Sequence, residues 1–327
     1  MYPDQPLMSD EEDIDALGIK ALKELITSCG LSTEDCIDKV DLRARAREAL
    51  EAKKAKKATS SSAAPSPPSR PAERQMGGYS CLVQGPADLI AGDAGAPAAD
   101  LLIIVLHGLG ATNRDLVDVV PMLIEQEPKL SAARIVTVCP QAPPGPMGNA
   151  WWTFDVQSLI MTQMMPAGPQ KEAAMAKMIR EKPQDLDTCR ARMKQLIEEA
   201  RAIAGGAAGQ LSPKRLVLCG FSLGAITSLD VALQMKEGEG PSGVIFMNGA
   251  PIVVDEWAAG LKRHSGLPVH ITSGLNDMTL PNYSSEWVRQ LLQTNGATVT
   301  HKYHPGGHEI GGKDVVQSIA SFLSSRL

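Results

Sequence analysis

Uninterrupted apolar runs mark the chain from position 100 onward. Leu101–Leu106 and Leu216–Cys219 contain no polar residue, and Pro268–Ser273 and Val299–Tyr303 have the composition of further strands. Apolar strands without polar alternation are typical of a parallel sheet that is buried on both faces. The segment from Asp185 to Ile203 has the spacing of a long amphipathic helix that could cover such a sheet. The pattern predicts an α/β architecture, with a mostly parallel sheet and helices on both faces.

The N-terminal part of the chain follows different patterns. Within residues 1–51, apolar positions recur at helical spacing from Ile14 to Ile26 and again from Val40 to Leu50, which predicts a small helical hairpin. Residues 52–78 pass from a lysine cluster to a stretch rich in Ser, Ala and Pro, which cannot bury enough apolar surface to offset its chain entropy. We therefore expect a hairpin over 1–51, a disordered linker over 52–78 and the α/β domain over 79–327.

One apolar run leads directly into the pentapeptide Gly220-Phe-Ser222-Leu-Gly224, and an apolar helical segment follows. A strand, a turn and a helix are the context in which G-x-S-x-G forms a nucleophile elbow, where one serine hydroxyl projects above the end of a parallel sheet. Glycine on either side of the serine leaves space where a Cβ would crowd the turn. Because glycine and serine are common, Ser222 is a convincing nucleophile only if its chemical partners also occur.

Those partners occur downstream, in the expected order. Asp277 follows the strand Pro268–Ser273, and His308 follows the strand Val299–Tyr303, so the chain order is nucleophile, acid and histidine, as in an α/β-hydrolase. A serine hydroxyl becomes reactive when an imidazole takes its proton, and a carboxylate holds that imidazole in one tautomer. We predict a catalytic triad of Ser222, His308 and Asp277.

Other residues nearby are alternatives for these roles. His304 stands four positions before His308, but the pair Gly306–Gly307 allows the close approach to the sheet edge that favours His308 as the base. Asp230 lies two turns into the helix after the elbow and should point elsewhere. Glu309 is interpreted as a solvated neighbour of the histidine.

The tetrahedral intermediate of acyl transfer carries a negative oxygen, which needs hydrogen-bond donors. The segment His107-Gly-Leu-Gly110 comes directly after the strand Leu101–Leu106, where an α/β-hydrolase places its oxyanion loop. We predict that the backbone N–H groups of Leu109 and Leu223 supply the donors. His107 is interpreted as a residue that shapes this loop and not as a base.

With these motifs, residues 79–327 resemble the phospholipase/carboxylesterase family of serine α/β-hydrolases, which includes the acyl-protein thioesterases. The segments that carry the resemblance are His107–Gly110, Pro140–Pro144, Gly148–Asp155, Gly220–Gly224 and Gly274–Pro281. The resemblance implies hydrolysis of carboxylic esters or thioesters through an acyl-enzyme on Ser222, without a cofactor or a metal. It also implies substrates such as short acyl esters, lysophospholipids or palmitoylated proteins.

The chain departs from the family after the nucleophile and after His107–Gly110, where the family often has Asp and Gly and this chain has Ala111-Thr-Asn113. The family usually has glutamine after the nucleophile, where this chain has Leu223. A backbone donor survives that change, whereas the orientation of the substrate is open. The paired tryptophans Trp151 and Trp152 and the segment Gly306–Ile310 resemble the bacterial esterase branch more than the animal thioesterases.

A methionine-rich segment lies between the tryptophan pair and the long amphipathic helix. Thioether side chains are flexible and polarisable, so they suit an adaptable apolar wall. We interpret the segment as a lid or acyl-chain groove near the triad, and a helix packed on the hydrolase core is the alternative. The predicted substrate-binding residues are Trp151, Trp152, Met161, Met164 and Met165.

Composition narrows the class of protein. A net charge of −5 argues against general nucleic-acid binding. The six cysteines show no metal-type spacing; Cys29 and Cys36 could approach each other around a turn, although reduced thiols fit a cytoplasmic chain better. The N-terminus lacks the pattern of a secretory signal, and the longest apolar run is about half of what a membrane span requires. We expect a cytoplasmic enzyme that makes at most peripheral membrane contact.

The N-terminal segment resembles a SAP-like helical hairpin, and some such hairpins bind DNA or proteins. Its basic positions Lys39, Arg43, Arg45 and Arg47 form either a binding face or a solvated helix face. Two alternatives to an ordinary esterase therefore stay open. The hydrolase fold could be catalytically idle and act as a binding module, or the hairpin could tether the chain to nucleic acid or to a protein partner.

Overall fold

The computed structural model of the chain describes residues 22, 26–27, 42–48, 71–153 and 155–327. The chain divides into two compact units, Met1–Ala64 and Pro65–Leu327, which are considered separately. In the first unit residues 42–48 are helical, and the buried side chains there are Leu22, Ile26, Leu42 and Ala46. The remainder of the predicted hairpin, the linker up to residue 70 and the cysteines Cys29 and Cys36 lie outside the described residues.

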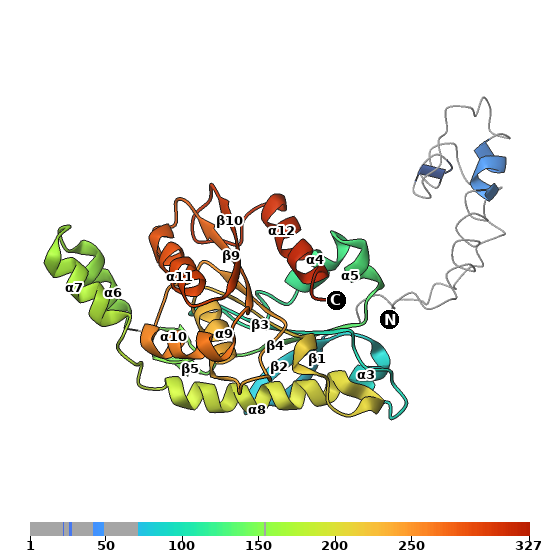
Figure 1. The fold of residues 1–327 in the computed structure, drawn as a ribbon. Coiled ribbons are helices and arrows are strands. Elements are labelled where there is room, and N and C mark those ends of the chain that lie inside the picture. Colours follow the sequence, from blue (N-terminus) through green and yellow to red (C-terminus); the bar gives the residue numbers. More distant parts are fainter. Residues whose placement is uncertain (1–21, 23–25, 28–41, 49–70, 154) are drawn as a thin grey trace, which may run out of the picture. The chain divides into compact units, whose positions relative to one another are not determined.

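The second unit is built on an eight-stranded sheet (Figure 1) with the order β1-β2-β4-β3-β7-β8-β9-β10. Strands β3, β4 and β7 to β10 run parallel, while β1 and β2 form an antiparallel hairpin at one edge. A separate short ribbon pairs β5 with β6. The strands are β1 (Ala72–Met76), β2 (Tyr79–Gln84), β3 (Leu101–Leu106), β4 (Ile135–Pro140), β5 (Pro144–Gly145), β6 (Gly148–Asn149), β7 (Leu216–Phe221), β8 (Gly243–Met247), β9 (Pro268–Gly274) and β10 (Thr298–His304).

Strand β1 corrects the predicted extent of the linker. Residues 72–76 were expected to be disordered, but they pair with β2 in the register Met76↔Tyr79. The turn that joins the two strands is Gly77–Gly78, where both residues have positive φ values that favour glycine. Three of the five residues of β1 are exposed, because an edge strand is covered on fewer sides. The strand therefore lacks the apolar run that predicts the central strands.

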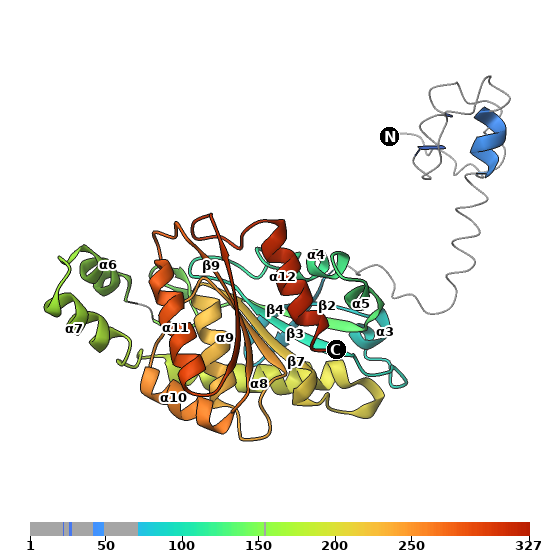
Figure 2. The same ribbon diagram turned by 45° about the horizontal axis from the view of Figure 1, so that its top comes forward.

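Helices cover both faces of the sheet (Figure 2), and each face has its own apolar core. Alternate residues of β3 belong to different cores: Leu102 and Ile104 pack on one face of the sheet, and Ile103 and Val105 pack on the other. One core packs against α8, α9, α10 and α11, and the other against α4, α5 and α12. The helices are α3 (Ala87–Ala91), α4 (Val119–Glu125), α5 (Pro128–Ala132), α6 (Val156–Met164), α7 (Pro169–Met178), α8 (Leu186–Gly205), α9 (Leu223–Gln234), α10 (Val254–Arg263), α11 (Asn282–Thr294) and α12 (Lys313–Ser324).

The pair α6 and α7 differs from the other helices, because it stands beyond the edge of the sheet layers in both views (Figures 1 and 2). None of the residues of α7 is fully buried, and on α6 only Thr162 is. The sheet and its covering helices confirm the predicted α/β architecture, and the paired short helices match the position of the methionine-rich segment.

Acid is expected to destabilise this fold through the buried imidazole of His270. Its ring nitrogens lie 2.7 Å from the Thr300 hydroxyl and 2.9 Å from the Ser318 hydroxyl, and burial lowers the pKa of His270 to about 4. An unfolded histidine has a pKa of about 6.5, so the unfolded chain binds the proton first as the pH falls. His270 therefore contributes full stability above about pH 6.5, and about 3 kcal/mol of it should be lost on reaching pH 4.

Denaturant unfolding of the wild type and of His270→Gln at several pH values tests this expectation. The plot of unfolding free energy against pH should be shallower for the variant between pH 6.5 and 4. Equal slopes for the two proteins would show that His270 is not the responsible group.

Candidate active site

The proposed nucleophile lies on a strained turn between β7 and α9. Ser222 has φ 55° and ψ −121°, a conformation that residues with side chains seldom adopt. A Cβ on Gly220 would lie 2.2 Å from the carbonyl oxygen of Gly224, and a Cβ on Gly224 would lie 2.0 Å from that of Leu106. Both positions therefore require glycine, as expected of a nucleophile elbow.

Three side chains from separate loops meet at this turn. His308 Nε2 lies 2.9 Å from Ser222 Oγ, and His308 Nδ1 lies 2.6 Å from Asp277 Oδ2. Because a carboxylate only accepts, Nδ1 carries the proton, and Nε2 is free to accept from the serine hydroxyl. The structure thus brings Ser222, His308 and Asp277 together in the order that the sequence predicts.

The acid is held rigidly behind the histidine. Asp277 Oδ1 accepts the backbone N–H groups of Thr279 and Leu280, each at 2.8 Å. Its Oδ2 accepts from Asn248 Nδ2 at 3.2 Å and from His308. The Asp277 side chain is only 2% exposed, so these hydrogen bonds hold the carboxylate in an orientation that faces the His308 imidazole.

The loop that carries His308 lies against the end of β9. A Cβ on Gly274 would lie 2.1 Å from the carbonyl oxygen of Gly307. The loop that carries His308 can therefore approach the end of β9 this closely only because residue 274 is glycine. His304, the alternative base, is at the end of β10 with only 2% of its surface exposed, and the Leu275 N–H donates to its carbonyl oxygen. The structure brings His308 and not His304 to the serine.

The other candidate acids are not placed to act on the histidine. Asp230 is fully buried and accepts a bidentate pair of hydrogen bonds from Arg190, both at 2.7 Å, and one from Trp257 Nε1 at 2.9 Å. It ties α9 to α8 and α10. Glu309 is exposed, as expected of a solvated neighbour.

The loop after β3 lies beside the serine. A Cβ on Gly108 would lie 3.3 Å from Ser222 Cβ, which places Leu109 next to the elbow. Leu223 is the first residue of α9, so its N–H has no carbonyl to bond within the helix. The N–H of Leu109 has no backbone partner among the residues that the structure describes. Both groups are therefore available as donors beside Ser222.

His107 shapes this loop through both ring nitrogens. Its Nδ1 lies 2.8 Å from the carbonyl oxygen of Gly108, and its Nε2 accepts the Ala142 N–H at 3.1 Å. Burial lowers the pKa of His107, so the ring is held neutral. This arrangement matches the interpretation of His107 as a structural residue.

The two tryptophans are buried and do not form an open wall. Trp151 Nε1 donates to the His107 carbonyl at 2.8 Å, and Trp152 Nε1 donates to Thr227 Oγ1 at 3.0 Å. Trp151 therefore supports the loop after β3 from the core, which differs from its predicted contact with substrate. Trp152 also lines a pocket beneath α6 and α7.

A pocket of about 600 Å³ lies beneath α6 and α7, within the range of small-molecule sites. Its lining includes two residues next to the candidate site: Ile226, one helical turn after Ser222, and Leu280, whose N–H binds Asp277. Apolar side chains from six segments line much of it: Leu159, Met175, Met178, Ile226, Ile252, Leu280 and Trp287.

None of the three predicted methionines lines this pocket. Met161 and Met164 are 62% and 78% exposed, and Met165 is half-buried outside the lining. The helix presents Leu159 and Thr162 to the pocket instead, because residues three apart share a face. Helical spacing from Ser222 could have indicated Ile226, whereas nothing local in the sequence indicates Trp287 of α11.

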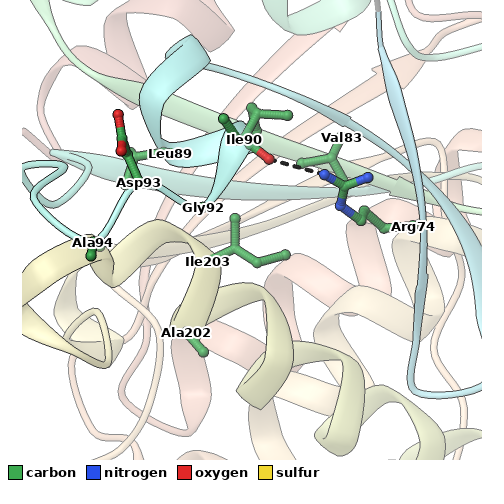
Figure 3. Close-up of a pocket in the computed structure, with 11 residues that line it drawn as sticks. Arg74, Val83, Leu89, Ile90, Gly92, Asp93, Ala94, Ala202 and Ile203 are labelled. Carbon is green, nitrogen blue, oxygen red and sulfur yellow. Dashed lines mark hydrogen bonds between the residues drawn. The ribbon is translucent and has the colours of Figure 1, made fainter.

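A second cavity, of about 300 Å³, lies between α3, β1 and the end of α8 (Figure 3). Arg74 lines this cavity, and its guanidinium group donates a hydrogen bond to the Ile90 carbonyl oxygen at 3.0 Å. The lining contains none of the residues that surround Ser222, so this cavity is separate from the candidate active site.

Within the described ranges, no cluster of His, Cys, Asp and Glu side chains is arranged to hold a metal ion. The same ranges contain no helix with the length and apolarity to span a bilayer. Cys81, Cys139, Cys189 and Cys219 are free thiols, and burial raises the pKa of Cys81, Cys189 and Cys219 to about 12. These thiols stay protonated and unreactive at neutral pH.

Comparison with known proteins identifies the fold. A probable SOBER1-like carboxylesterase of Arabidopsis thaliana is 25% identical over 240 residues, which cover 70% of this chain and 80% of that protein. The structure of esterase PE8 matches with a TM-score of 0.52 at 23% identity, over 71% of this chain and 97% of that one. A carboxylesterase from Mesorhizobium loti matches with a TM-score of 0.50 at 17% identity, over 75% and 94% of the two chains.

These structures confirm the predicted α/β-hydrolase fold. The sequence profile of the Phospholipase/Carboxylesterase family matches residues 93–327, which is most of the chain. That match spans the loop after β3, the turn at Ser222 and the loops that carry Asp277 and His308. The chain therefore belongs to the phospholipase/carboxylesterase family, and its enzymatic class is that of an ester hydrolase.

Proposed function

We propose that this protein is a serine esterase in which Ser222, His308 and Asp277 form the catalytic triad. The observation that carries the proposal is the continuous hydrogen-bond chain from the serine hydroxyl through both imidazole nitrogens to a buried carboxylate. Such a chain supplies the base that a serine needs before it can attack an acyl group.

The first half of the reaction acylates the enzyme. Ser222 Oγ attacks the ester carbonyl while its proton passes to His308 Nε2, and Asp277 stabilises the resulting imidazolium. The negative oxygen of the tetrahedral intermediate accepts from the N–H groups of Leu109 and Leu223; removing one such donor typically costs roughly 3–4 kcal/mol of barrier. The imidazolium then gives its proton to the departing alcohol, and the acyl group stays on the serine.

The second half repeats these steps with water. His308 takes a proton from a water molecule, whose oxygen attacks the acyl carbon, and the carboxylic acid leaves as Ser222 regains its proton. A thioester would follow the same steps with a thiol as the departing group. Apart from water and the substrate, every group in this scheme belongs to the chain.

The pocket beneath α6 and α7 is proposed to bind the acyl chain. Its apolar lining favours an alkyl group, and Ile226 and Leu280 connect it to the elbow and to the acid loop. A volume of about 600 Å³ lies within the range of small-molecule sites. We propose esters of short and medium acyl chains as the substrate class. Lysophospholipids and palmitoylated proteins carry longer chains and are the alternatives that the next experiment separates.

A series of p-nitrophenyl esters of increasing chain length, beside a palmitoyl thioester, tests the substrate class. We expect kcat/KM to peak at short or medium chains. Leu159→Trp should fill the pocket and move the peak to shorter chains, with the acetyl ester unaffected. Met161→Trp is the matched control, because that side chain on the same helix points to solvent and its replacement should leave the profile unchanged.

Two results would contradict this assignment. A maximum at the palmitoyl chain would exclude a short-chain esterase, and an identical profile for the wild type and Leu159→Trp would place the acyl chain elsewhere.

Labelling with a fluorophosphonate distinguishes the enzyme from a catalytically idle binding module. The reagent modifies a serine only where a base activates the hydroxyl. We expect one labelled peptide, containing Ser222, and parallel loss of esterase activity. Folded protein that stays unlabelled would favour the binding module.

A further inference from the structure

Asn248 occupies a position that the catalytic scheme above does not use. It directly follows β8, the strand between β7 and β9, at the same edge of the sheet as the nucleophile and the acid. Its φ is 50°, in the left-handed region, which asparagine adopts more readily than most residues. Only 1% of its surface is exposed, and its N–H donates to the Thr272 carbonyl of β9 at 2.9 Å.

The side-chain amide of Asn248 joins the two loops of the triad. Its Nδ2 lies 3.2 Å from Asp277 Oδ2 and 3.2 Å from the carbonyl oxygen of Gly307, the residue before His308. An amide nitrogen has two hydrogens, so it can donate to both acceptors at once. The reverse orientation of the amide would place an oxygen against two oxygens, which fixes the assignment of its atoms.

The oxygen of the same amide is buried without a hydrogen-bond partner from the described part of the chain. A buried acceptor in this state weakens the fold. An apolar residue would avoid that cost, but it would adopt φ 50° less readily and would lose the two donated hydrogen bonds.

We propose that Asn248 is a positioning residue, which sets the distance between the acid loop and the histidine loop through its amide. Asp277 Oδ2 accepts both the amide and His308 Nδ1, so the amide orients the carboxylate toward the ring. The bond to Gly307 holds the backbone from which that ring extends. Together the two bonds keep His308 Nε2 at 2.9 Å from Ser222 Oγ. This inference rests on the proposed esterase function.

Asn248→Gly removes the amide and tolerates the positive φ without strain. Loss of a residue that supports catalytic side chains typically lowers activity by 10- to 100-fold, so we expect kcat for an acetyl ester to fall by about that factor. KM should stay within about twofold, because Asn248 does not line the pocket and the lost interaction does not touch bound substrate. Asn248→Asp keeps the shape but places a carboxyl oxygen against the Asp277 carboxylate, so it should lose at least as much kcat.

Ser285→Ala is the matched control. Its buried hydroxyl donates to the Gly249 carbonyl at 3.2 Å, beside Asn248, without contacting the triad. This variant should lose stability to a similar or greater extent and keep its kcat. A fall in kcat for both variants would indicate general loosening of the loop.

A double-variant cycle separates positioning from other effects. If Asn248 acts through His308, then Asn248→Gly should not lower further the residual activity of His308→Ala. An equal additional loss in that background, or an unchanged kcat in folded Asn248→Gly and Asn248→Asp, would overturn the inference. A His308→Ala protein with full activity would instead refute the proposed function itself.

Discussion

Ser222→Ala is expected to lower kcat for ester hydrolysis by about 10⁴-fold or more, as found when a triad serine is removed from other hydrolases. The hydroxyl is the only group of this turn that lies at hydrogen-bond distance from His308, so no neighbouring side chain replaces it. The fold should persist, since the substitution removes one atom and leaves both flanking glycines in place. The measurements are steady-state kinetics with an acetyl ester and labelling with a fluorophosphonate, which should both be lost.

Ser222→Gly is the informative companion. The serine has a positive φ of 55°, which glycine adopts without strain, whereas alanine keeps the unfavourable Cβ. Both variants should be inactive, but Ser222→Gly should be more stable than Ser222→Ala, by about 1 kcal/mol in denaturant unfolding. Esterase activity above about 1% of the wild type in either pure variant would mean that another residue is the nucleophile.

The triad geometry could be predicted because local sequence constrains it tightly. Gly220 and Gly224 have no room for a Cβ, and Gly274 has none where Gly307 approaches, so these glycines mark the turns directly. The apolar run of β3 reveals a strand covered on both faces. Parallel strands place their carboxyl ends at one edge, so residues that follow β7, β9 and β10 meet there.

Other features depend on packing between distant segments, which local patterns do not record. Strand β1 is a polar edge strand without a diagnostic apolar pattern. Trp151 was predicted from its neighbours in sequence to contact substrate, but it donates to the His107 carbonyl from within the core. The methionine-rich composition of α6 predicts that Met161 contacts substrate, but its side chain is 62% exposed and does not line the pocket. Which side chains of α6 face the pocket depends on how that helix packs, and the local sequence does not record this.

Asn248 shows the same limit at the site itself. Nothing near it in the sequence forms a motif, and its amide acquires a role only when β8 lies between the nucleophile strand and the acid strand. Residues that act through others are therefore found from hydrogen bonds in three dimensions.

His308→Ala is expected to be far more damaging than a substitution of His304. Without an imidazole at 2.9 Å, the Ser222 hydroxyl keeps its proton and the departing alcohol receives none, so kcat should fall by about 10⁴-fold or more. His304 is buried at the end of β10 and does not contact the serine, so His304→Gln should lower kcat by about tenfold or less, the scale of an indirect effect. Its main cost should be stability, since the side chain fills space beside Gly306 and Gly311.

The pH dependence gives a second, independent criterion for the base. The acidic limb of kcat/KM reports protonation of the catalytic base in the free enzyme, so the wild type and His304→Gln should share that limb. His308→Ala should lose it, because the group that titrates is gone and hydroxide becomes the only base available to its residual reaction. If the two variants were equally damaging, the assignment of His308 as the base would fail. If His304→Gln lost the acidic limb and His308→Ala kept it, His304 would be the base. The structure would then have to change to bring His304 to the serine, because its ring now lies buried beneath the glycine-rich loop that presents His308.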